Sequence, residues 1–176
     1  MRITGGILKG RQVEVPGGII RPAMDRMRES VFAVLGDLSG ASFLDIFSGS
    51  GIIALEAASR GAAPVEAVER DGGKRKTLLR NAAISPVRIQ CHFMAAELYI
   101  RRARNAFDYI FCDPPFIYKF KAELLRSIAA APLMREGSRL LLHRPRDDDP
   151  GTWPENLIRE DSREYGRSVV DFFVRR

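Results

Sequence analysis

Two short loops in this sequence carry residue types that could do chemistry. The first, Asp45–Gly51 (DIFSGSG), follows an apolar run, and the second, Asp113–Phe116 (DPPF), follows another. A glycine-rich turn between a strand and a helix lets a ligand approach the backbone closely. An acidic side chain followed by two prolines presents hydrogen-bond acceptors, because proline has no amide donor. Together the loops predict a site in which an adenosyl cofactor meets a planar amine, the arrangement needed to methylate an amino nitrogen.

The first loop favours S-adenosylmethionine over a dinucleotide. Gly49 and Gly51 permit the tight turn, and Asp45 lies just before them. In a nicotinamide or flavin site the pyrophosphate would meet this region and be repelled by Asp45, whereas a sulfonium would be attracted. Glu69 ends the next predicted strand, where an acid accepts hydrogen bonds from ribose hydroxyls. Taken alone, the glycines also fit a tight turn that holds no ligand.

The second loop offers a hydrogen-bond acceptor for each N–H of an exocyclic amine, and an aromatic ring to stack on the base. The Asp113 carboxylate and the Pro114 carbonyl can each accept one N–H, which aims the nitrogen lone pair at the methyl group. Phe116, with Tyr118, can stack on the flat ring. Asp113 would take up the proton released by the transfer. The alternative for the prolines alone is that they end a strand and do nothing more.

The elements that must position these loops alternate between strand and helix patterns. Strands separated by helices imply a parallel sheet with helices on both faces. The tail predicts two strands joined at Gly166, a hairpin that adds a reversed strand at or near one edge. The sequence thus predicts an α/β fold with a doubly wound, Rossmann-like, mostly parallel sheet. The predicted strands are 42–47, 65–69, 87–93, 107–112, 139–143, 156–164 and 168–175, and the predicted helices are 51–60, 72–84, 95–104 and 118–131.

The first forty residues lack the alternation of strand and helix patterns that the rest of the sequence shows. Residues 1–20 hold several glycines between short β-branched segments, which predicts a small β-hairpin or two-strand arm. A helix is expected over 25–37, with Asp25 as its cap. We therefore divide the chain into an N-terminal arm and helix, 1–40, and a main domain, 41–176.

The composition favours a globular protein outside the membrane over a membrane-spanning or secreted one. The 176 residues carry a formal net charge of +6 and 28% charged residues, which fits a globular protein with a polyanionic partner. No apolar run is long enough to cross a membrane, and the first residues lack the apolar stretch of a signal peptide, so we expect a cytoplasmic protein. Cys91 and Cys112 are expected to be free thiols. His92 and His143 have no neighbours that suggest a metal site.

With both loops in view, the sequence resembles the bacterial RsmD family of class I S-adenosylmethionine-dependent methyltransferases. The resemblance covers nearly the whole chain, and the N-terminal arm is what narrows it from a broad class of amino methyltransferases. It implies methylation of the N2 amine of a specific guanine in 16S ribosomal RNA, in the 30S subunit or an assembly intermediate. It rests on Arg2–Gly6, Lys9–Arg11, Arg21–Glu29, Leu44–Gly51, Leu55–Ala57, Ser59–Ala62 and Phe107–Phe116.

The resemblance also implies roles for individual residues. The third strand of such enzymes commonly ends in Asp or Asn beside the adenine, and this chain has neither there, so backbone groups near Met94 or Ala95 are expected to serve. The expected cofactor-binding residues are Asp45, Phe47, Gly49, Gly51, Glu69, Met94 and Ala95, the catalytic residues are Asp113, Pro114 and Phe116, and the RNA-binding residues are Lys9, Arg11, Arg21, Arg28 and Tyr118.

Three other functions compete with this one. DNA adenine-N6 and cytosine-N4 methyltransferases use a similar acidic or amide residue followed by Pro-Pro-aromatic, but this chain has no room for a separate target-recognition domain. Methylation of a protein amide is less favoured, because related enzymes commonly carry Asn where Asp113 stands. A non-catalytic RNA-binding module for ribosome assembly is the third, and three carboxylates at strand ends argue against it. We expect a monomer that needs no metal.

Overall fold

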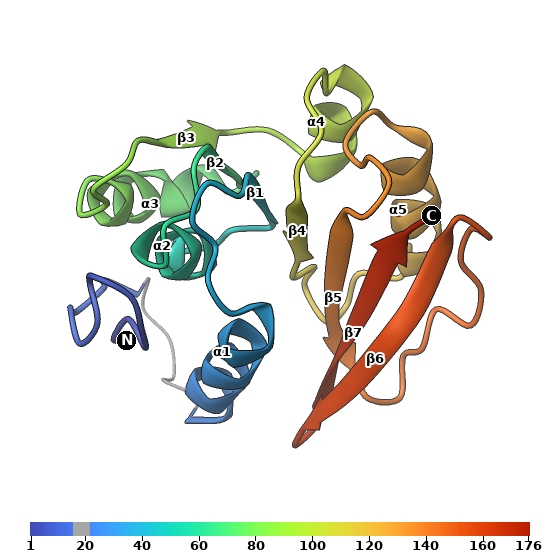
Figure 1. The fold of residues 1–176 in the computed structure, drawn as a ribbon, viewed down its shortest axis with the longest axis horizontal. Coiled ribbons are helices and arrows are strands. Elements are labelled where there is room, and N and C mark those ends of the chain that lie inside the picture. The colour runs from blue at the N-terminus through green and yellow to red at the C-terminus, as the bar shows by residue number, and fades with distance from the viewer. Residues whose placement is uncertain (16–21) are drawn as a thin grey trace.

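The computed structural model describes residues 1–15 and 22–176. Within these residues the chain forms a seven-stranded sheet in the order β3-β2-β1-β4-β5-β7-β6, with helices on both faces (Figure 1). The predicted doubly wound α/β sheet is confirmed. The elements are α1 Pro22–Leu35, β1 Phe43–Ile46, α2 Ile52–Ser59, β2 Val65–Val68, η1 Gly72–Lys74, α3 Arg75–Ala82, β3 Ile89–His92, α4 Ala96–Arg102, β4 Tyr109–Cys112, α5 Lys121–Ala130, β5 Arg139–Pro145, β6 Leu157–Tyr165 and β7 Ser168–Arg175.

The two faces of the sheet bury two separate apolar layers. Successive strand residues point to opposite faces, so apolar runs are needed where both faces are covered. Phe43 of β1 and Phe111 of β4 join one cluster with residues of α1, α2 and α3. Their neighbours Leu44 and Ile110 join a second cluster with residues of α4 and α5. This double burial explains why the central strands read as continuous apolar runs.

Strand register brings the two sequence-predicted loops to one edge of the sheet. β1 pairs in parallel with β2 on one side and β4 on the other, and Ile46 lies opposite both Val68 and Cys112. The chain winds outward in opposite directions from β1 and β4, which makes their junction the switch point of the sheet. Ligands bind outside the carboxyl ends of the strands at such a point. Both loops begin there.

The C-terminal hairpin supplies the predicted reversed strand. β7 pairs antiparallel with β5 and with β6, so β7 lies inside the sheet and β6 forms its edge. A bulge interrupts the β6–β7 pairing between Arg159 and Asp161. Gly166 lies in the connecting turn with φ 63°. Because the hairpin adds two strands beyond β5, the junction of β1 and β4 lies near the centre of the sheet.

The predictions for two helices and for the N-terminal arm differ from the structure. The helix expected over 72–84 divides into the short 3-10 helix η1 and α3. The helix expected from Asp25 begins at Pro22 instead, because proline is well suited to a first helical turn. The predicted two-strand arm forms only one isolated bridge, between Arg2 and Gln12.

The N-terminal arm, residues 1–13, makes polar contacts with α2 and, through the Arg2 carbonyl and Arg28, with α1. Glu56 of α2 accepts hydrogen bonds from the amide and hydroxyl of Thr4, at 2.8 and 2.9 Å. Ser59 accepts two more hydrogen bonds from the arm: the Ile7 amide donates to its carbonyl oxygen and the Leu8 amide donates to its hydroxyl oxygen. Gly6 passes so close to α2 that a Cβ there would lie 1.9 Å from the Ser59 carbonyl oxygen. The arm therefore combines backbone pairing of its own, from the Ile3 amide to the Arg11 carbonyl and from the Val13 amide to the Met1 carbonyl, with contacts that hold it against α2.

No helix among the described residues is both long and apolar enough to span a bilayer. Cys91 and Cys112 are free thiols, as expected.

Candidate active site

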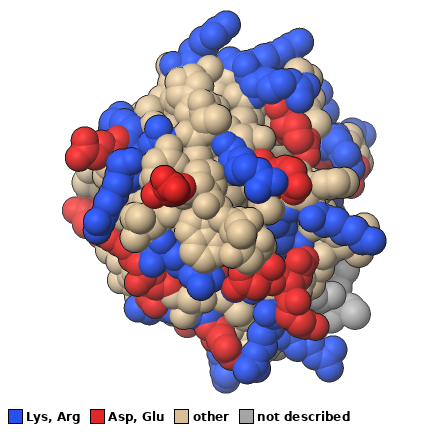
Figure 2. All heavy atoms as spheres, turned by 90° about the vertical axis from the view of Figure 1, so that its right-hand side faces the viewer, with Lys and Arg blue, Asp and Glu red and all other residues tan. Residues whose placement is uncertain are grey.

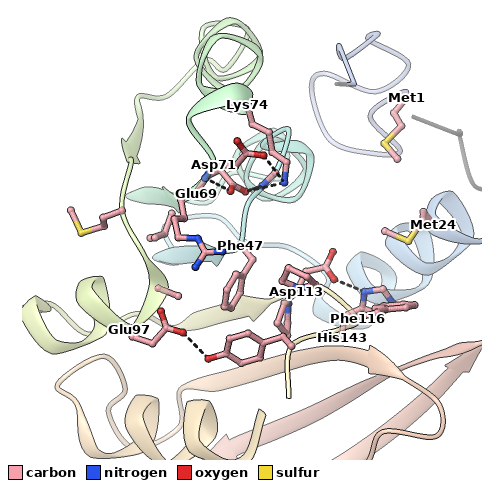
Figure 3. A pocket seen from close by; sticks show the side chains of 18 residues that line it. Met1, Met24, Phe47, Glu69, Asp71, Lys74, Glu97, Asp113, Phe116 and His143 are labelled. Atoms are coloured by element: carbon pink, nitrogen blue, oxygen red, sulfur yellow. Dashed lines mark hydrogen bonds and ion pairs between the residues drawn. The ribbon is translucent and has the colours of Figure 1, made fainter. Parts of the chain in front are cut away.

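A pocket of about 870 Å³ opens at the switch point (Figure 3). Its walls come from the loops that follow β1, β2, β3 and β4, together with the end of β5 and two methionines of the N-terminal region. The sequence-predicted residues on its wall are Phe47, Gly49, Glu69, Met94, Asp113, Pro114, Phe116 and Tyr118. The wall residues that sequence reasoning did not assign are Met1, Met24, Val68, Arg70, Asp71, Lys74, Ala96, Glu97, Pro115 and His143.

The glycine loop is held open by backbone geometry and by Glu69. Gly51 has φ 81°, and a Cβ there would lie 2.5 Å from a methyl carbon of Leu78, so the helix can start this close to α3 only with glycine. Phe47 is the one described non-glycine residue with positive φ, at 65°. Glu69 accepts the amide hydrogens of Gly49 and Asp71, each at 2.8 Å. One carboxylate thereby ties together the loops after β1 and β2.

Asp45 and Gly51 lie behind the loop rather than on the pocket wall. Asp45 is 1% exposed, and its Oδ2 accepts hydrogen bonds from the Ser48 hydroxyl at 2.7 Å and the Ala54 amide at 3.2 Å. Its other oxygen, Oδ1, has no hydrogen-bond partner among the described residues. The structure thus places Asp45 behind the pocket wall, where it braces the turn from the loop to α2, and its expected contact with the cofactor stays a prediction.

Asp45 should make the stability of the fold depend on pH. Burial raises its pKa from 3.8 to about 7, although the Ser48 hydrogen bond opposes this rise. The folded chain thus holds a proton that the unfolded chain has lost, and the free energy of unfolding falls as the pH rises from about 4 to about 7, then levels off. We expect the difference in this free energy between Asp45→Asn and wild type to change across that window in urea titrations. A difference that is constant with pH would contradict the assignment.

The Asp113–Phe116 loop faces the glycine loop across the pocket. The Asp113 amide donates to the Ile46 carbonyl at 3.2 Å, which ties the start of this loop to β1. Phe116 is 42% exposed, so much of its ring is open to a ligand. Tyr118 packs edge-on against Phe47, with ring centroids 5.5 Å apart. The aromatic side chains of the two loops thus meet inside one pocket.

Tyr118 has a second partner that the sequence did not reveal. Its hydroxyl donates to Glu97 of α4 at 2.7 Å, and burial together with this bond raises the pKa of the phenol. Met94 lies on the wall, whereas Ala95 caps α4 and the wall continues with Ala96. Glu97 therefore stands on the same side of the pocket where the usual Asp or Asn of the third strand is missing.

The pocket carries more negative than positive charge. Glu69, Asp71, Glu97 and Asp113 line it, and Lys74 lies 3.8 Å from Glu69 and 3.9 Å from Asp71. Attraction between opposite charges is strong where water is partly excluded. The site therefore suits a ligand with positive charge and hydrogen-bond donors better than a phosphate-rich dinucleotide.

His143 is the wall residue that sequence reasoning should have found and did not. It is 1% exposed, and its Nδ1 lies 2.8 Å from Asp113 Oδ1. Because Cys112 pairs with Leu142, the residues that follow them, Asp113 and His143, lie side by side. The available signal was its position directly after the apolar run Leu140–Leu142, at the carboxyl end of the strand next to β4.

The predicted RNA-binding residues fall into separate groups. Lys9 and Arg11 are exposed on the arm, and Arg21 lies outside the described residues. The prediction of RNA binding is wrong for Arg28. This residue is 1% exposed, and its guanidinium forms ion pairs with Asp25 and Glu56 and donates a hydrogen bond to the Arg2 carbonyl. A buried, paired guanidinium cannot hold a phosphate at the surface.

Comparison with known proteins agrees with this geometry. The family model described as Conserved hypothetical protein 95 matches residues 1–174. The chain is 28% identical to YlbH of Bacillus subtilis across 100% of both chains. It is 34% identical to ribosomal RNA small subunit methyltransferase D of Escherichia coli over 66% of this chain and 60% of that one. A solved structure of the Escherichia coli protein yhhF has a TM-score of 0.89 at 27% identity, with 99% of this chain and 97% of that chain covered. The chain therefore belongs to the Conserved hypothetical protein 95 family, which is the RsmD family of methyltransferases.

Proposed function

We propose that this protein transfers a methyl group from S-adenosylmethionine to the exocyclic N2 amine of a guanine in 16S ribosomal RNA of the small subunit. The observation that carries the proposal is that the glycine loop and the Asp113–Phe116 loop line one acidic pocket of about 870 Å³. The similarity to ribosomal RNA small subunit methyltransferase D supports ribosomal RNA as the substrate. The loop chemistry supports an exocyclic amine as the methyl acceptor, and the guanine N2 atom is what the resemblance to the RsmD family implies.

The pocket divides naturally between cofactor and base. The adenosyl group would lie along the side built by Gly49, Glu69 and Met94, with Glu69 beside the ribose. Its sulfonium would point toward Asp113, and the acidic wall stabilises that positive charge. When bound, the cofactor supplies an electrophilic methyl carbon that needs no metal.

The base side of the pocket positions the amine and accepts its proton. The Asp113 carboxylate and the Pro114 carbonyl accept the two N–H groups, and Phe116 stacks on the ring. With the amine held in this way, its nitrogen lone pair would form the new N–C bond, and the S–C bond of the cofactor would break with its electrons left on sulfur. The methylated nitrogen then gives one proton to Asp113. Most of the rate enhancement comes from holding the two reactants in line.

The base must leave its stack to reach this pocket. The arm and helix, residues 1–40, would hold the RNA backbone through Lys9, Arg11 and Arg21, because phosphates supply sequence-independent affinity. Figure 2 shows the face near β6 and the C-terminal strands, where basic and acidic side chains are interspersed. That face offers RNA no continuous positive patch, so the positive charge of the arm is the better candidate for gripping phosphate.

Replacing Phe116 with alanine tests the stacking role. One base–aromatic stack contributes about 1–3 kcal/mol, so we expect the RNA KM to rise, or kcat/KM to fall, about 5- to 100-fold. Cofactor affinity measured by calorimetry should be unchanged, and Phe116→Tyr should retain most activity. Equal losses in cofactor binding and in RNA methylation would show that the ring belongs to the cofactor side instead.

Parallel assays with three acceptors test the function. Methyl-labelled S-adenosylmethionine is incubated with 30S subunits that lack the modification, with naked 16S RNA and with duplex DNA. Label in either form of ribosomal RNA supports the proposal and identifies the preferred form. Label in DNA alone would favour an adenine-N6 or cytosine-N4 methyltransferase. No label and no cofactor binding at about millimolar concentration would favour the non-catalytic RNA-binding module.

A further inference from the structure

We propose that His143 is a positioning residue that holds both base-facing groups of the Asp113–Phe116 loop, through a hydrogen bond to Asp113 and a ring contact with Phe116. This inference rests on the proposed function, because it assigns those groups to the amine and the base. His143 Nδ1 lies 2.8 Å from Asp113 Oδ1, and its ring meets Phe116 edge-on at 5.6 Å and 65° (Figure 3). One buried side chain therefore contacts both functional groups of the loop.

The sheet makes His143 a rigid support. β4 ends at Cys112, so Asp113 already belongs to a loop. β5 continues to Pro145, and His143 is paired with Val170 of β7 inside the sheet. A side chain anchored in a central strand moves less than one in a loop, and active sites built on such elements are more accurately positioned. His143 can thus transmit the rigidity of β5 to Asp113.

The hydrogen bond has a defined direction. An ionised carboxylate can only accept, so the imidazole must donate from Nδ1. This bond occupies Asp113 Oδ1 and leaves Oδ2 free for the amine. His143 Nε2 is buried and has no hydrogen-bond partner among the described residues. A ring held by one hydrogen bond and one aromatic contact has no other polar task in the described part of the fold.

His92 provides an internal comparison. It is the only other histidine in the chain, and its Nε2 lies 2.6 Å from Glu66 Oε2. Tyr99 donates to the same carboxylate oxygen at 2.8 Å. This pair lies on β2 and β3, and His92 and Glu66 are not on the pocket wall. The two histidines should therefore differ both in tautomer and in their effect on methylation.

Two substitutions separate the two contacts of His143. Asparagine places an N–H donor near the position of Nδ1 but removes the ring, whereas phenylalanine keeps a ring beside Phe116 but removes the donor. For His143→Phe we expect kcat to fall about 100-fold with little change in the RNA KM, because Asp113 is no longer held in line with the methyl group. For His143→Asn we expect kcat within about threefold of wild type and an RNA KM raised about 5- to 10-fold, since Phe116 loses its support. Cofactor affinity should be unchanged in both.

His92→Asn is the matched control, and it should leave kcat and the RNA KM unchanged. Parallel losses in His143→Phe and His143→Asn would reduce His143 to a structural residue and overturn the proposal. Wild-type activity in both variants would overturn it as well.

A second measurement tests the pairing without any activity assay. With ¹⁵N-labelled histidine, the spectrum of the wild-type protein contains two imidazoles. We expect the proton of His143 on Nδ1 and that of His92 on Nε2. Asp113→Ala should shift the His143 signals and leave those of His92 in place. His143 protonated on Nε2 alone, or unmoved by Asp113→Ala, would contradict the inference, even if the protein proved to methylate another acceptor.

Discussion

Replacing Asp113 with alanine is expected to lower kcat for RNA methylation about 10²- to 10⁴-fold, the range for loss of a positioned acid–base group. The variant removes the carboxylate that we propose accepts an amine hydrogen and then its proton, while the glycine loop and Glu69 stay intact. Because Asp113 sits on the base side of the pocket, the cofactor dissociation constant should change less than about threefold, a shift below 1 kcal/mol.

Kinetics and calorimetry on one preparation check this expectation. Single-turnover transfer to 30S subunits gives the rate of the chemical step, and titration with S-adenosylmethionine gives the affinity. Glu123→Ala is a matched control, because that carboxylate is exposed on α5 and, among the described residues, forms an ion pair only with Arg126. If Asp113→Ala loses cofactor affinity and turnover to the same degree, Asp113 holds the cofactor rather than the amine.

Replacing Glu56 with alanine is expected to be strongly destabilising. The Glu56 side chain is fully buried and accepts hydrogen bonds from Thr4, Arg28 and Arg60. Removing one partner of a buried ion pair costs about 3–5 kcal/mol, because the other charges stay buried without compensation. For a domain of this size that loss corresponds to a fall in Tm of about 10 °C.

Urea unfolding and hydrogen exchange test the two consequences of this substitution. Glu56→Ala should lower the free energy of unfolding and expose the Thr4 amide to rapid exchange, since Glu56 holds the arm to α2. Glu164→Ala is the control, because Glu164 is an exposed partner of Arg146 on β6 and should change stability by less than about 1 kcal/mol. A similarly small effect for Glu56 would show that the arm is held by its apolar residues instead.

The sheet could be predicted because its signals are local. Apolar runs such as Leu44–Phe47 and Phe107–Cys112 are bounded by turn residues, and the glycine loop marks the passage from strand to helix. Residues on the same edge of a parallel sheet then follow from topology alone. The sequence therefore predicts that Gly49, Glu69 and Asp113 surround one crevice, and all three line the pocket.

The remaining features depend on contacts between distant segments. Arg28 looks like a surface base in the sequence, and its burial follows from Glu56 on another helix, which no local pattern reveals. The arm has hairpin-like backbone bonds between Ile3 and Arg11 and between Met1 and Val13, but it forms only one isolated bridge, and the amides of Thr4 and Leu8 bond to α2. Asp45 was expected at the ligand because its position relative to the glycines suggested contact. Its side chain instead turns back to Ser48 and Ala54.

Identification of the methylated nucleoside tests the central claim most directly. Ribosomal RNA labelled by the wild-type protein is digested to nucleosides and separated by chromatography with mass detection, with RNA from the Asp113→Ala reaction as the blank. The proposed function predicts that the label elutes as N2-methylguanosine and is absent from the blank. Label in N6-methyladenosine, in a ring-methylated guanosine or on a ribose hydroxyl would contradict the assignment of the exocyclic guanine amine to this pocket.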